Sequence, residues 1–365
     1  MKFLKKIKSA IRQQIITKRY HRISVGMNAL ATSFSKGSEL PLLTSEEKKQ
    51  IRDRWGKIIP DVKSGYIFYQ IFKKYNEFDS RYVPSCYYHP YITSCLNPQK
   101  YAYILSDKNI LQNVYHHIKH AKSVIRNIDG LFLDESNNIL TTDEAIDIIK
   151  RNRPLIIKKS IESCGGKNIT IINSESTIED IKKILKEFNK DFVIQELVKQ
   201  SEDTKRFNPS SLNTIRITSL FINGKFSICN AILRCGSKDS IVDNGGMGGT
   251  MVRVGSDGKL GKYGLNFKGE KFDNSNGIKF EGQEIHNFDS ITKIIEQSHT
   301  SMPLCGIIGW DISLDEKNEP ILIEANLTIP GVFGEQLCCG NMFGDRTDEV
   351  IEYIQKNKRQ DRIFF

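Results

Sequence analysis

GIIGWDISLDEKNEPILIEAN, residues 306–326, is the stretch of sequence that decides the fold. Two apolar runs flank a polar turn, DEKNEP, which is typical of two antiparallel strands joined as a hairpin. A turn centred on Lys317–Asn318 places Asp311 directly opposite Glu324. Asn326 then falls on the face that carries Glu324, two residues along the strand. The segment therefore predicts two acids and one amide on a single face of a β-hairpin.

Two carboxylates that face each other across neighbouring strands repel, and such a pair normally costs stability. A cation between them removes that cost. Two carboxylates and one amide supply hard oxygen ligands, which suit magnesium when phosphate oxygens complete its shell. We therefore predict that Asp311, Glu324 and Asn326 are metal ligands. In the alternative interpretation the strand register differs and one of the two acids faces solvent.

A second informative stretch is PLIIKKSIESCGGKNI, residues 154–169, which places a lysine at the end of a buried strand. The small residues after it leave backbone N–H groups free to approach phosphate oxygens, and the lysine adds a point charge. The Walker A pattern is absent. A plain Gly-Gly turn between two strands is the alternative. The predicted phosphate-binding residues in this stretch are Lys158, Ser163, Gly165 and Gly166.

The run DFVIQELVKQSED, residues 191–203, reads as a strand that leads into a short apolar linker. Such a linker between two lobes has the usual shape of an adenine-binding hinge, with backbone groups meeting the base and an acid holding the ribose hydroxyls. An ordinary edge strand is the alternative. The predicted contacts are Glu196, Leu197 and Val198 for the base, and Glu202 or Asp203 for the ribose.

Composition places the chain among ordinary globular proteins, with 39% hydrophobic and 26% charged residues in 365. This length predicts two or three structural units. The net charge is +10, and residues 1–37 alone carry nine positive charges and no acid. The remaining part of the chain is therefore nearly neutral. No nucleic-acid-binding surface is expected on it. Residues 1–22 have helical apolar spacing, which suits either an anionic membrane surface or packing on the protein body. Eight scattered cysteines favour a reducing cytoplasm.

The secondary-structure pattern changes along the chain. The first 95 residues read as helical and then irregular, whereas strands and helices alternate from about residue 100 onward. No apolar run is long enough to cross a bilayer. The predicted strands are 154–159, 191–197, 214–222, 226–234, 306–314 and 320–326, and the clearest helices are 143–151 and 177–189.

Three motifs carry a resemblance to a known family: NTIRIT (213–218), GGMGGTMVRVGSDGKL (245–260), and GWDISL with ILIEAN (309–326). Together they resemble the ATP-grasp superfamily, most closely its sugar-transfer-associated family of glutamate-ligase-like proteins. The step from Asp311 to Glu324 and Asn326 is similar to the metal triad of D-alanine–D-alanine ligases. The resemblance implies an α+β ATP-grasp fold, in which two α+β subdomains clasp ATP after a mostly helical N-terminal region.

The resemblance also implies a division of the chain and further site residues. The expected regions are a basic, helical N-terminal region (1–95), a lid and nucleotide-binding subdomain (96–200), a catalytic, metal-binding subdomain (201–345), and a C-terminal helix with a basic tail (346–365). Lys108 and Lys158 resemble lysines that reach the nucleotide phosphates. Arg216, Arg234 and Asn244 resemble residues that steady the γ-phosphate and an acyl phosphate.

One departure from the pattern concerns positive charge. Gly309 stands where D-alanine ligases carry an arginine two residues before the metal aspartate. Arg216 or Arg234 could supply that charge, and a surface salt bridge is the alternative for either.

The implied function is an ATP- and magnesium-dependent carboxylate–amine ligase that acts through an acyl phosphate. Its expected setting is cytoplasmic, with possible contact between residues 1–22 and the inner membrane. Its expected substrates are ATP and a small carboxylate or sugar acid from bacterial surface-polysaccharide or capsule synthesis. Two other hypotheses remain open: a phosphotransferase acting on a sugar or other hydroxyl, and a non-catalytic nucleotide-binding scaffold. The assembly state is left open.

Overall fold

The structure is a computed structural model that describes residues 24–36, 39–161, 169–237 and 248–357. The predicted membrane-binding segment, residues 1–22, lies outside the described residues. The predicted site residues Ser163, Gly165, Gly166 and Asn244 also lie outside them.

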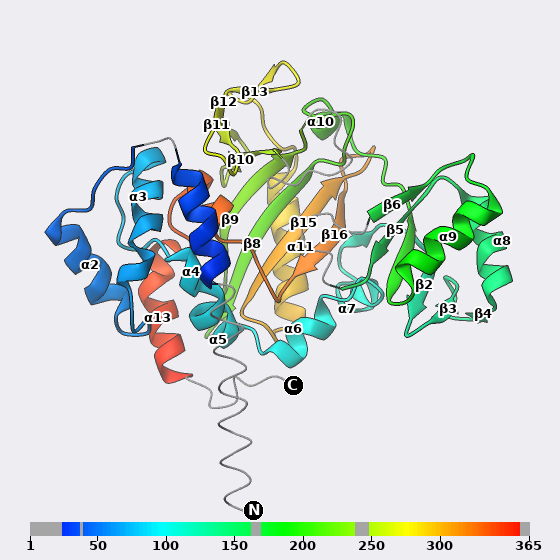
Figure 1. Cartoon of the computed structure of the whole chain (residues 1–365), viewed down its shortest axis with the longest axis horizontal. Helices are drawn as coiled ribbons and strands as arrows, with labels where there is room; N and C mark the ends of the chain where they lie inside the picture. Colours follow the sequence, from blue (N-terminus) through cyan, green and yellow to red (C-terminus); the bar gives the residue numbers. More distant parts are fainter. Residues whose placement is uncertain (1–23, 37–38, 162–168, 238–247, 358–365) are drawn as a thin grey trace, which may run out of the picture.

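The chain begins with a helical region, drawn in dark blue to cyan in Figure 1. It opens with a helix over residues 24–35, and α2 starts at a capping box in which Thr44 and Glu47 satisfy each other's backbone N–H groups. Burial of Ile51 and Trp55 on one side of α2 fixes it against its neighbours. The elements of this region are α2 (Ser45–Trp55), η1 (Lys63–Gly65), α3 (Tyr66–Tyr75), α4 (Ser85–Tyr87), the π-helix η2 (Tyr88–Thr93), α5 (Ser94–Leu96), α6 (Gln99–Leu105) and α7 (Leu111–Val114).

An eight-stranded sheet forms the centre of the molecule (Figure 1). All of its neighbouring strands are antiparallel except the first pair, β1 and β16. In spatial order its strands are β1 (Lys119–His120), β16 (Pro320–Asn326), β15 (Ile307–Leu314), β8 (Thr214–Ile222), β9 (Lys225–Cys235), β10 (Thr250–Val254), β11 (Leu260–Leu265) and β12 (Lys271–Phe272).

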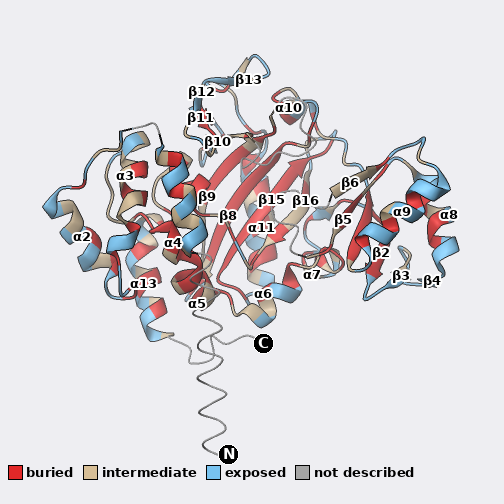
Figure 2. Cartoon of the chain, in the orientation of Figure 1, coloured by how far each residue is buried: buried red, intermediate tan, exposed pale blue. Residues whose placement is uncertain are grey.

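The two faces of this sheet pack on different cores. Alternate apolar residues of β8, such as Ile215 and Ile217, belong to the core beneath α11 (Phe288–Ser301). The opposite face is covered by the helical N-terminal region together with α12 (Phe333–Cys339) and α13 (Thr347–Lys356), and its core includes Leu220 and Ile222. Figure 2 shows the central strands buried along most of their length.

A six-stranded antiparallel sheet forms a separate lobe, drawn in cyan and green in Figure 1. Two helices pack on it, α8 (Thr142–Asn152) and α9 (Ile178–Phe188), each started by a capping box, and the box at Thr177 and Asp180 includes the predicted N-cap. The strands in spatial order are β4 (Ile139–Leu140), β3 (Leu131–Leu133), β2 (Ser123–Ile128), β7 (Phe192–Glu196), β5 (Leu155–Lys159) and β6 (Ile169–Ile172).

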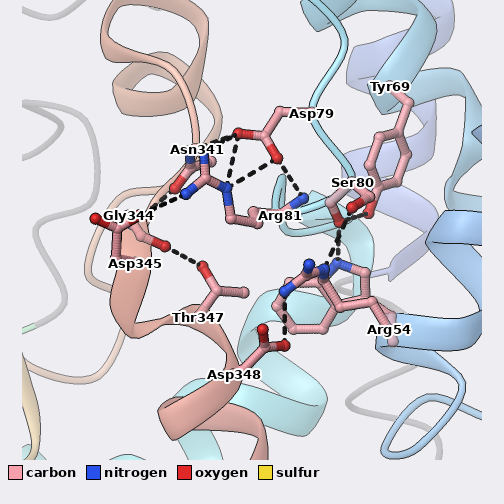
Figure 3. A network of polar contacts seen from close by, with 11 residues as sticks. Arg54, Tyr69, Asp79, Ser80, Arg81, Asn341, Gly344, Asp345, Thr347 and Asp348 are labelled. Carbon is pink, nitrogen blue, oxygen red and sulfur yellow. Dashed lines mark hydrogen bonds and ion pairs between the residues drawn. The ribbon is translucent and has the colours of Figure 1, made fainter.

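Polar contacts fix the helical N-terminal region to the C-terminal end of the chain (Figure 3). Asp79 holds the guanidinium of Arg81 through both carboxylate oxygens and accepts a hydrogen bond from Asn341 at 2.8 Å. Arg81 also reaches Asp345 at 2.7 Å. This interface follows η5 (Gly344–Arg346) into α13.

Deeper in the same interface, Gln336 of α12 pairs with the backbone of Val83. Its side-chain oxygen accepts from the Val83 N–H at 2.8 Å, and its nitrogen donates to the Val83 carbonyl at 2.9 Å. Gln336 is fully buried. The N-terminal region is therefore held to α12 by a pair of buried hydrogen bonds as well as by apolar packing.

The α+β class and the helical start predicted from the sequence are confirmed. All six predicted strands form, with bounds that differ by at most one residue at either end, and the predicted helices correspond to α8 and α9. Cys86, Cys229, Cys305, Cys338 and Cys339 are free thiols. No helix among the described residues has the length and apolar character needed to span a membrane.

Candidate ATP- and metal-binding site

The acid pair lies where the sequence predicts it. Asp311 of β15 is the register partner of Glu324 of β16, and Asn326 pairs with Gly309 two residues along. The turn is centred on Lys317, because Leu314 pairs with Pro320. Ile323 is an extra residue in β16, and this bulge moves the register so that the two acids still face each other.

Arginines from neighbouring strands hold the buried Asp311 carboxylate. Arg216 of β8 donates from Nε at 2.5 Å and from Nη2 at 3.0 Å, and Arg234 of β9 lies 3.5 Å away. Burial alone raises the pKa of Asp311, but the charges of the two arginines outweigh it and leave the pKa below its ordinary value. Asn326 adds a hydrogen bond to the same carboxylate at 3.2 Å.

Gly309 lies beside the guanidinium of Arg216. Arg216 is the register partner of Asp311, and a Cβ atom at Gly309 would lie 3.5 Å from Arg216 Nη1. The guanidinium therefore lies beside the glycine that stands in place of the expected arginine. This position indicates that Arg216 supplies positive charge at the site and does not form a surface salt bridge.

Two lysines bring further positive charge to the site. Lys108 Nζ lies 2.9 Å from Glu324 Oε1, and the Lys108 backbone N–H donates to the carbonyl of Ser160, just beyond β5. Lys158 of β5 is buried, and burial lowers its pKa to about 8, with the charge of Lys108 acting in the same direction and Glu324 opposing it. Lys108, before α7, and Lys158, near the end of β5, thus both bring positive charge to Glu324.

A cavity of 660 Å³ lies against β5, β7 and the segment after β7. This volume is in the range of small-molecule and cofactor sites. Five predicted nucleotide-binding residues line it: Lys158, Glu196, Leu197, Val198 and Glu202. The carboxylate of Asp203, the other residue predicted for the ribose, lies 2.9 Å from Nδ1 of His286, and Asp203 is not among the residues that line the cavity.

The apolar residues that line this cavity were not predicted from the sequence. Strand alternation could have found Ile156, which lies on the same face of β5 as Lys158. Ile171 of β6 and the bulge residue Ile323 come from other strands, so no local pattern marks them. Apolar walls with a few polar groups suit a flat ring with polar edges.

The contact of Glu335, in α12, with the site was not predicted from the sequence either. It is 5% exposed, and its Oε1 lies 3.5 Å from Nη1 of Arg216. Nothing in the sequence near Glu335 marks it, because the contact joins a helix to a strand more than a hundred residues earlier.

The predicted metal ligands fit a magnesium ion by donor type, since two carboxylates and an amide from adjoining strands provide hard oxygen atoms. Among the residues that the structure describes, no group of three or more His, Cys, Asp or Glu side chains is placed to hold a metal. Asp311, Glu324 and Asn326 would therefore need phosphate or water oxygens to complete the coordination. Arg216 hydrogen-bonds both Asp311 oxygens, so a cation bound there would share that carboxylate.

Several solved structures resemble the chain weakly. An L-amino acid ligase from Bacillus licheniformis matches at 11% identity and a TM-score of 0.41, covering 69% of this chain and 48% of that one. D-alanyl-alanine synthetase A from Vibrio cholerae matches at 14% and 0.40, covering 70% and 65%. N5-carboxyaminoimidazole synthetase from Staphylococcus aureus, complexed with ADP, matches at 11% and 0.37, covering 61% and 44%. The chain spans less than half the length of the L-amino acid ligase and of the N5-carboxyaminoimidazole synthetase.

A search of the curated proteins found no match to this sequence. The family comparison is decisive by contrast, because residues 89–352 match the family described as sugar-transfer associated ATP-grasp. That match covers most of the chain, including both sheets and all the predicted site residues. The chain therefore belongs to the sugar-transfer associated ATP-grasp family.

Proposed function

We propose that the protein is an ATP- and magnesium-dependent carboxylate–amine ligase that acts through an acyl phosphate. The observation that carries the proposal is the pairing of Asp311 with Glu324, each in contact with a positive side chain, Arg216 for the first and Lys108 for the second. Membership of the ATP-grasp family supports ATP as the nucleotide that the protein binds.

The described residues divide into two groups in this proposal. The 660 Å³ cavity holds the adenine and ribose, with Val198 and Ile156 against the base and Glu202 near the ribose hydroxyls. Lys158 lines the same cavity, so it places a positive charge close to the phosphates. The lobe with the six-stranded sheet would thus act as the lid, and the eight-stranded sheet would carry the catalytic residues.

The second group surrounds the phosphates and the reacting carboxylate. Asp311, Glu324 and Asn326 would hold magnesium, which when bound neutralises charge on the phosphates. Arg216 and Arg234 stabilise negative charge that develops as the phosphoryl group moves, and their burial strengthens that effect. Ser163, Gly165, Gly166 and Asn244, outside the described residues, are proposed to contact phosphate as well.

We further propose a small carboxylate or sugar acid as the acceptor and an amino acid or amine as its partner, in surface-polysaccharide or capsule synthesis. The family description supports the link to sugar transfer. A phosphotransferase acting on a hydroxyl, or a non-catalytic nucleotide-binding scaffold, is the alternative.

One assay separates these functions. Purified protein is given ATP, magnesium, candidate carboxylic acids and hydroxylamine. A hydroxamate formed together with ADP supports the ligase, whereas ADP with a phosphorylated alcohol and no hydroxamate refutes it. Absence of acceptor-dependent turnover favours the scaffold. The Glu324→Gln variant keeps the size of the side chain and removes its charge, so it is the matched control and is expected to lose turnover by about 100-fold or more.

The basic N-terminus leads to a separate proposal, that residues 1–22 bind the anionic surface of the inner membrane. Deletion of these residues should abolish sedimentation with liposomes that contain phosphatidylglycerol. Unchanged sedimentation of the shortened chain would refute the proposal.

A further inference from the structure

The segment that carries Lys108 joins the two sheets of the molecule. Leu105 of α6 and Leu111 of α7, on either side of it, pack in the core that the eight-stranded sheet shares with α11. Between them, the Lys108 backbone N–H donates to the Ser160 carbonyl of the six-stranded lobe at 3.0 Å. α7 lies beside this lobe in Figure 1. The segment is therefore held by apolar packing on one side and by a hydrogen bond on the other.

Asn109 adds two further bonds to the six-stranded lobe. Its side-chain nitrogen donates to the Asn127 carbonyl of β2 at 3.1 Å, and its own carbonyl accepts from Nη1 of Arg126 at 3.3 Å. Asn109 is 1% exposed, so both bonds are shielded from water. Asn127 is in turn fixed within the lobe, because its side-chain oxygen accepts from the Asp191 N–H at 3.1 Å. The lobe thus holds the residue next to Lys108 through both its side chain and its backbone.

Arg126 is a buried arginine that forms no ion pair with the residues that the structure describes. Its guanidinium donates instead to two neutral acceptors, the Asn109 carbonyl and the side-chain oxygen of Asn137. Hydrogen bonds from Asn138 lower the pKa of Asp134, and the charge of Arg126 adds only a small part to that effect. A buried charge without an acid partner costs stability. The contacts of Arg126 therefore serve to bind the segment at Asn109 and not to balance a carboxylate.

Arg126 also lies on the face of the lobe that carries Lys158. It is the register partner of Val193 in β7, and Val193 is the partner of Lys158 in β5. Register partners project from the same face of a sheet, so Arg126 and Lys158 stand two strands apart on one face. Lys158 lines the 660 Å³ cavity, whereas Arg126 is not among the residues that line it. Arg126 is thus placed to act on the Lys108 segment and not directly on a ligand in the cavity.

We propose that Arg126 is a positioning residue for Lys108: with Asn109 it fixes the Lys108 segment to the six-stranded lobe, so that the Lys108 ammonium group reaches the nucleotide phosphates. A planar guanidinium can bond two acceptors at once, here Asn109 and Asn137, which a lysine ammonium on a flexible stem does less well. Lys108 then follows any movement of the lobe when the site closes. The inference rests on the proposed function, because it requires ATP as the ligand.

The test is a double-mutant cycle between Arg126 and Lys108. The affinity of the full chain for a non-hydrolysable ATP analogue with magnesium is measured by isothermal titration calorimetry. Arg126→Met should lower the affinity about ten-fold when Lys108 is present. In the Lys108→Met background the same substitution should change the affinity by less than about two-fold, because no ammonium group is left to position. A merely structural role would give the same loss in both backgrounds.

Arg153→Met is the matched control. Arg153 belongs to the same lobe and, like Arg126, donates to backbone oxygen, in its case that of Lys150 at 3.1 Å and that of Ser176. These contacts lie at the start of β5 and do not involve the Lys108 segment. The nucleotide affinity should therefore stay unchanged in Arg153→Met.

Two further variants separate position from charge. Arg126→Lys keeps the positive charge but shortens the reach to the two acceptors, so its affinity should fall as in Arg126→Met. Asn109→Ala removes the bond to the Asn127 carbonyl and leaves Arg126 in place. Its loss of affinity should also disappear in the Lys108→Met background.

Three results would overturn the inference: unchanged affinity in Arg126→Met, an equal loss with and without Lys108, or full affinity in Arg126→Lys. If Arg126→Met does not fold, Asn109→Ala decides by the same cycle. If Lys108→Met binds too weakly to be measured, Arg126→Lys decides. Failure of the native chain to bind the nucleotide defeats the proposed function, whereas native binding without the expected coupling defeats the positioning role alone.

Discussion

Two polar regions of the molecule are built in opposite ways. In the network of Figure 3, charged and polar side chains from the two ends of the chain are paired, and the hydroxyl of Tyr69 beside it donates to the Tyr82 carbonyl. In the site around Asp311 and Glu324, by contrast, like charges are brought together, since burial and the charge of Lys108 both lower the pKa of Lys158, to about 8.

The difference separates two uses of buried polar groups. Pairing at the Tyr69 side satisfies each group within the chain, so it stabilises the docking of the N-terminal region. Around Asp311 and Glu324 the chain instead buries Lys158 near a second positive charge, Lys108, which costs stability and suits an anionic ligand. The following predictions test this division, from the largest expected effect to the smallest.

The largest effect is expected at Asp311, the best-paired acid of the site. Asp311→Ala would leave the buried Arg216 without its bidentate partner, and the loss should lower the free energy of unfolding by about 3–5 kcal/mol. Urea denaturation measures it. Asp311→Asn, which keeps one acceptor oxygen, should lose less. An Asp311→Ala chain as stable as the native one would show that the ion pair adds nothing to the fold.

Lys158 should show an effect of the opposite sign. Its pKa is lowered to about 8 by burial and by Lys108, so the protonated lysine destabilises the folded chain. Lys158→Met should therefore raise the free energy of unfolding at pH 7 by roughly 3 kcal/mol, while nucleotide binding is lost.

The pH dependence follows from the direction of this shift. The cost of the charged lysine is complete below about pH 8 and disappears as the pH rises toward the ordinary lysine value of 10.5. The advantage of Lys158→Met should therefore shrink between pH 8 and pH 10.5. Urea denaturation at pH 7 and pH 10 measures it, and an equal advantage at both would contradict the burial argument.

A smaller loss is expected on the paired side, at Gln336. Gln336→Leu keeps an apolar side chain in the core but leaves the Val83 N–H and carbonyl without partners, which should cost about 2 kcal/mol. Thermal unfolding measures the loss. Nucleotide binding should be unaffected where the chain is folded, and a change in it would show that the paired region and the site around Asp311 are not independent.

The smallest effect is expected at Arg81, at the outer edge of the network. Its partner Asp345 is fully exposed and the arginine itself is about one third exposed, so solvent screens the pair. Arg81→Ala should cost about 1 kcal/mol or less, most of it from the contact with Asp79. A loss as large as that of Gln336→Leu would mean that the outer network, and not the buried pair, holds the N-terminal region.

The sequence predicts the parts of the site that local patterns encode. Asp311 and Glu324 could be placed opposite each other because the hairpin is short, although the turn centre was predicted half a residue too far along the chain. The bulge at Ile323 corrected that offset. Lys158 and the segment at Glu196–Val198 could be found because each ends a well-marked strand.

The remaining features depend on docking between distant segments. Glu335 reaches Arg216 across more than a hundred residues. Asp203 has a local pattern typical of a ribose contact, but the fold brings His286 beside it. The strand β1 joins the eight-stranded sheet although the sequence groups it with the lid region. Periodicity carries no information about such contacts.

The shared core of the two chain ends has a consequence for synthesis. Phe68 and Phe72, from early in the chain, pack in one cluster with Val350 and Ile354 from its far end. During translation the first helices therefore emerge with an apolar face whose covering residues are made hundreds of residues later. Those helices remain exposed to aggregation or to chaperones until α13 leaves the ribosome. The order of synthesis thus delays completion of this core until the residues of α13 have been made.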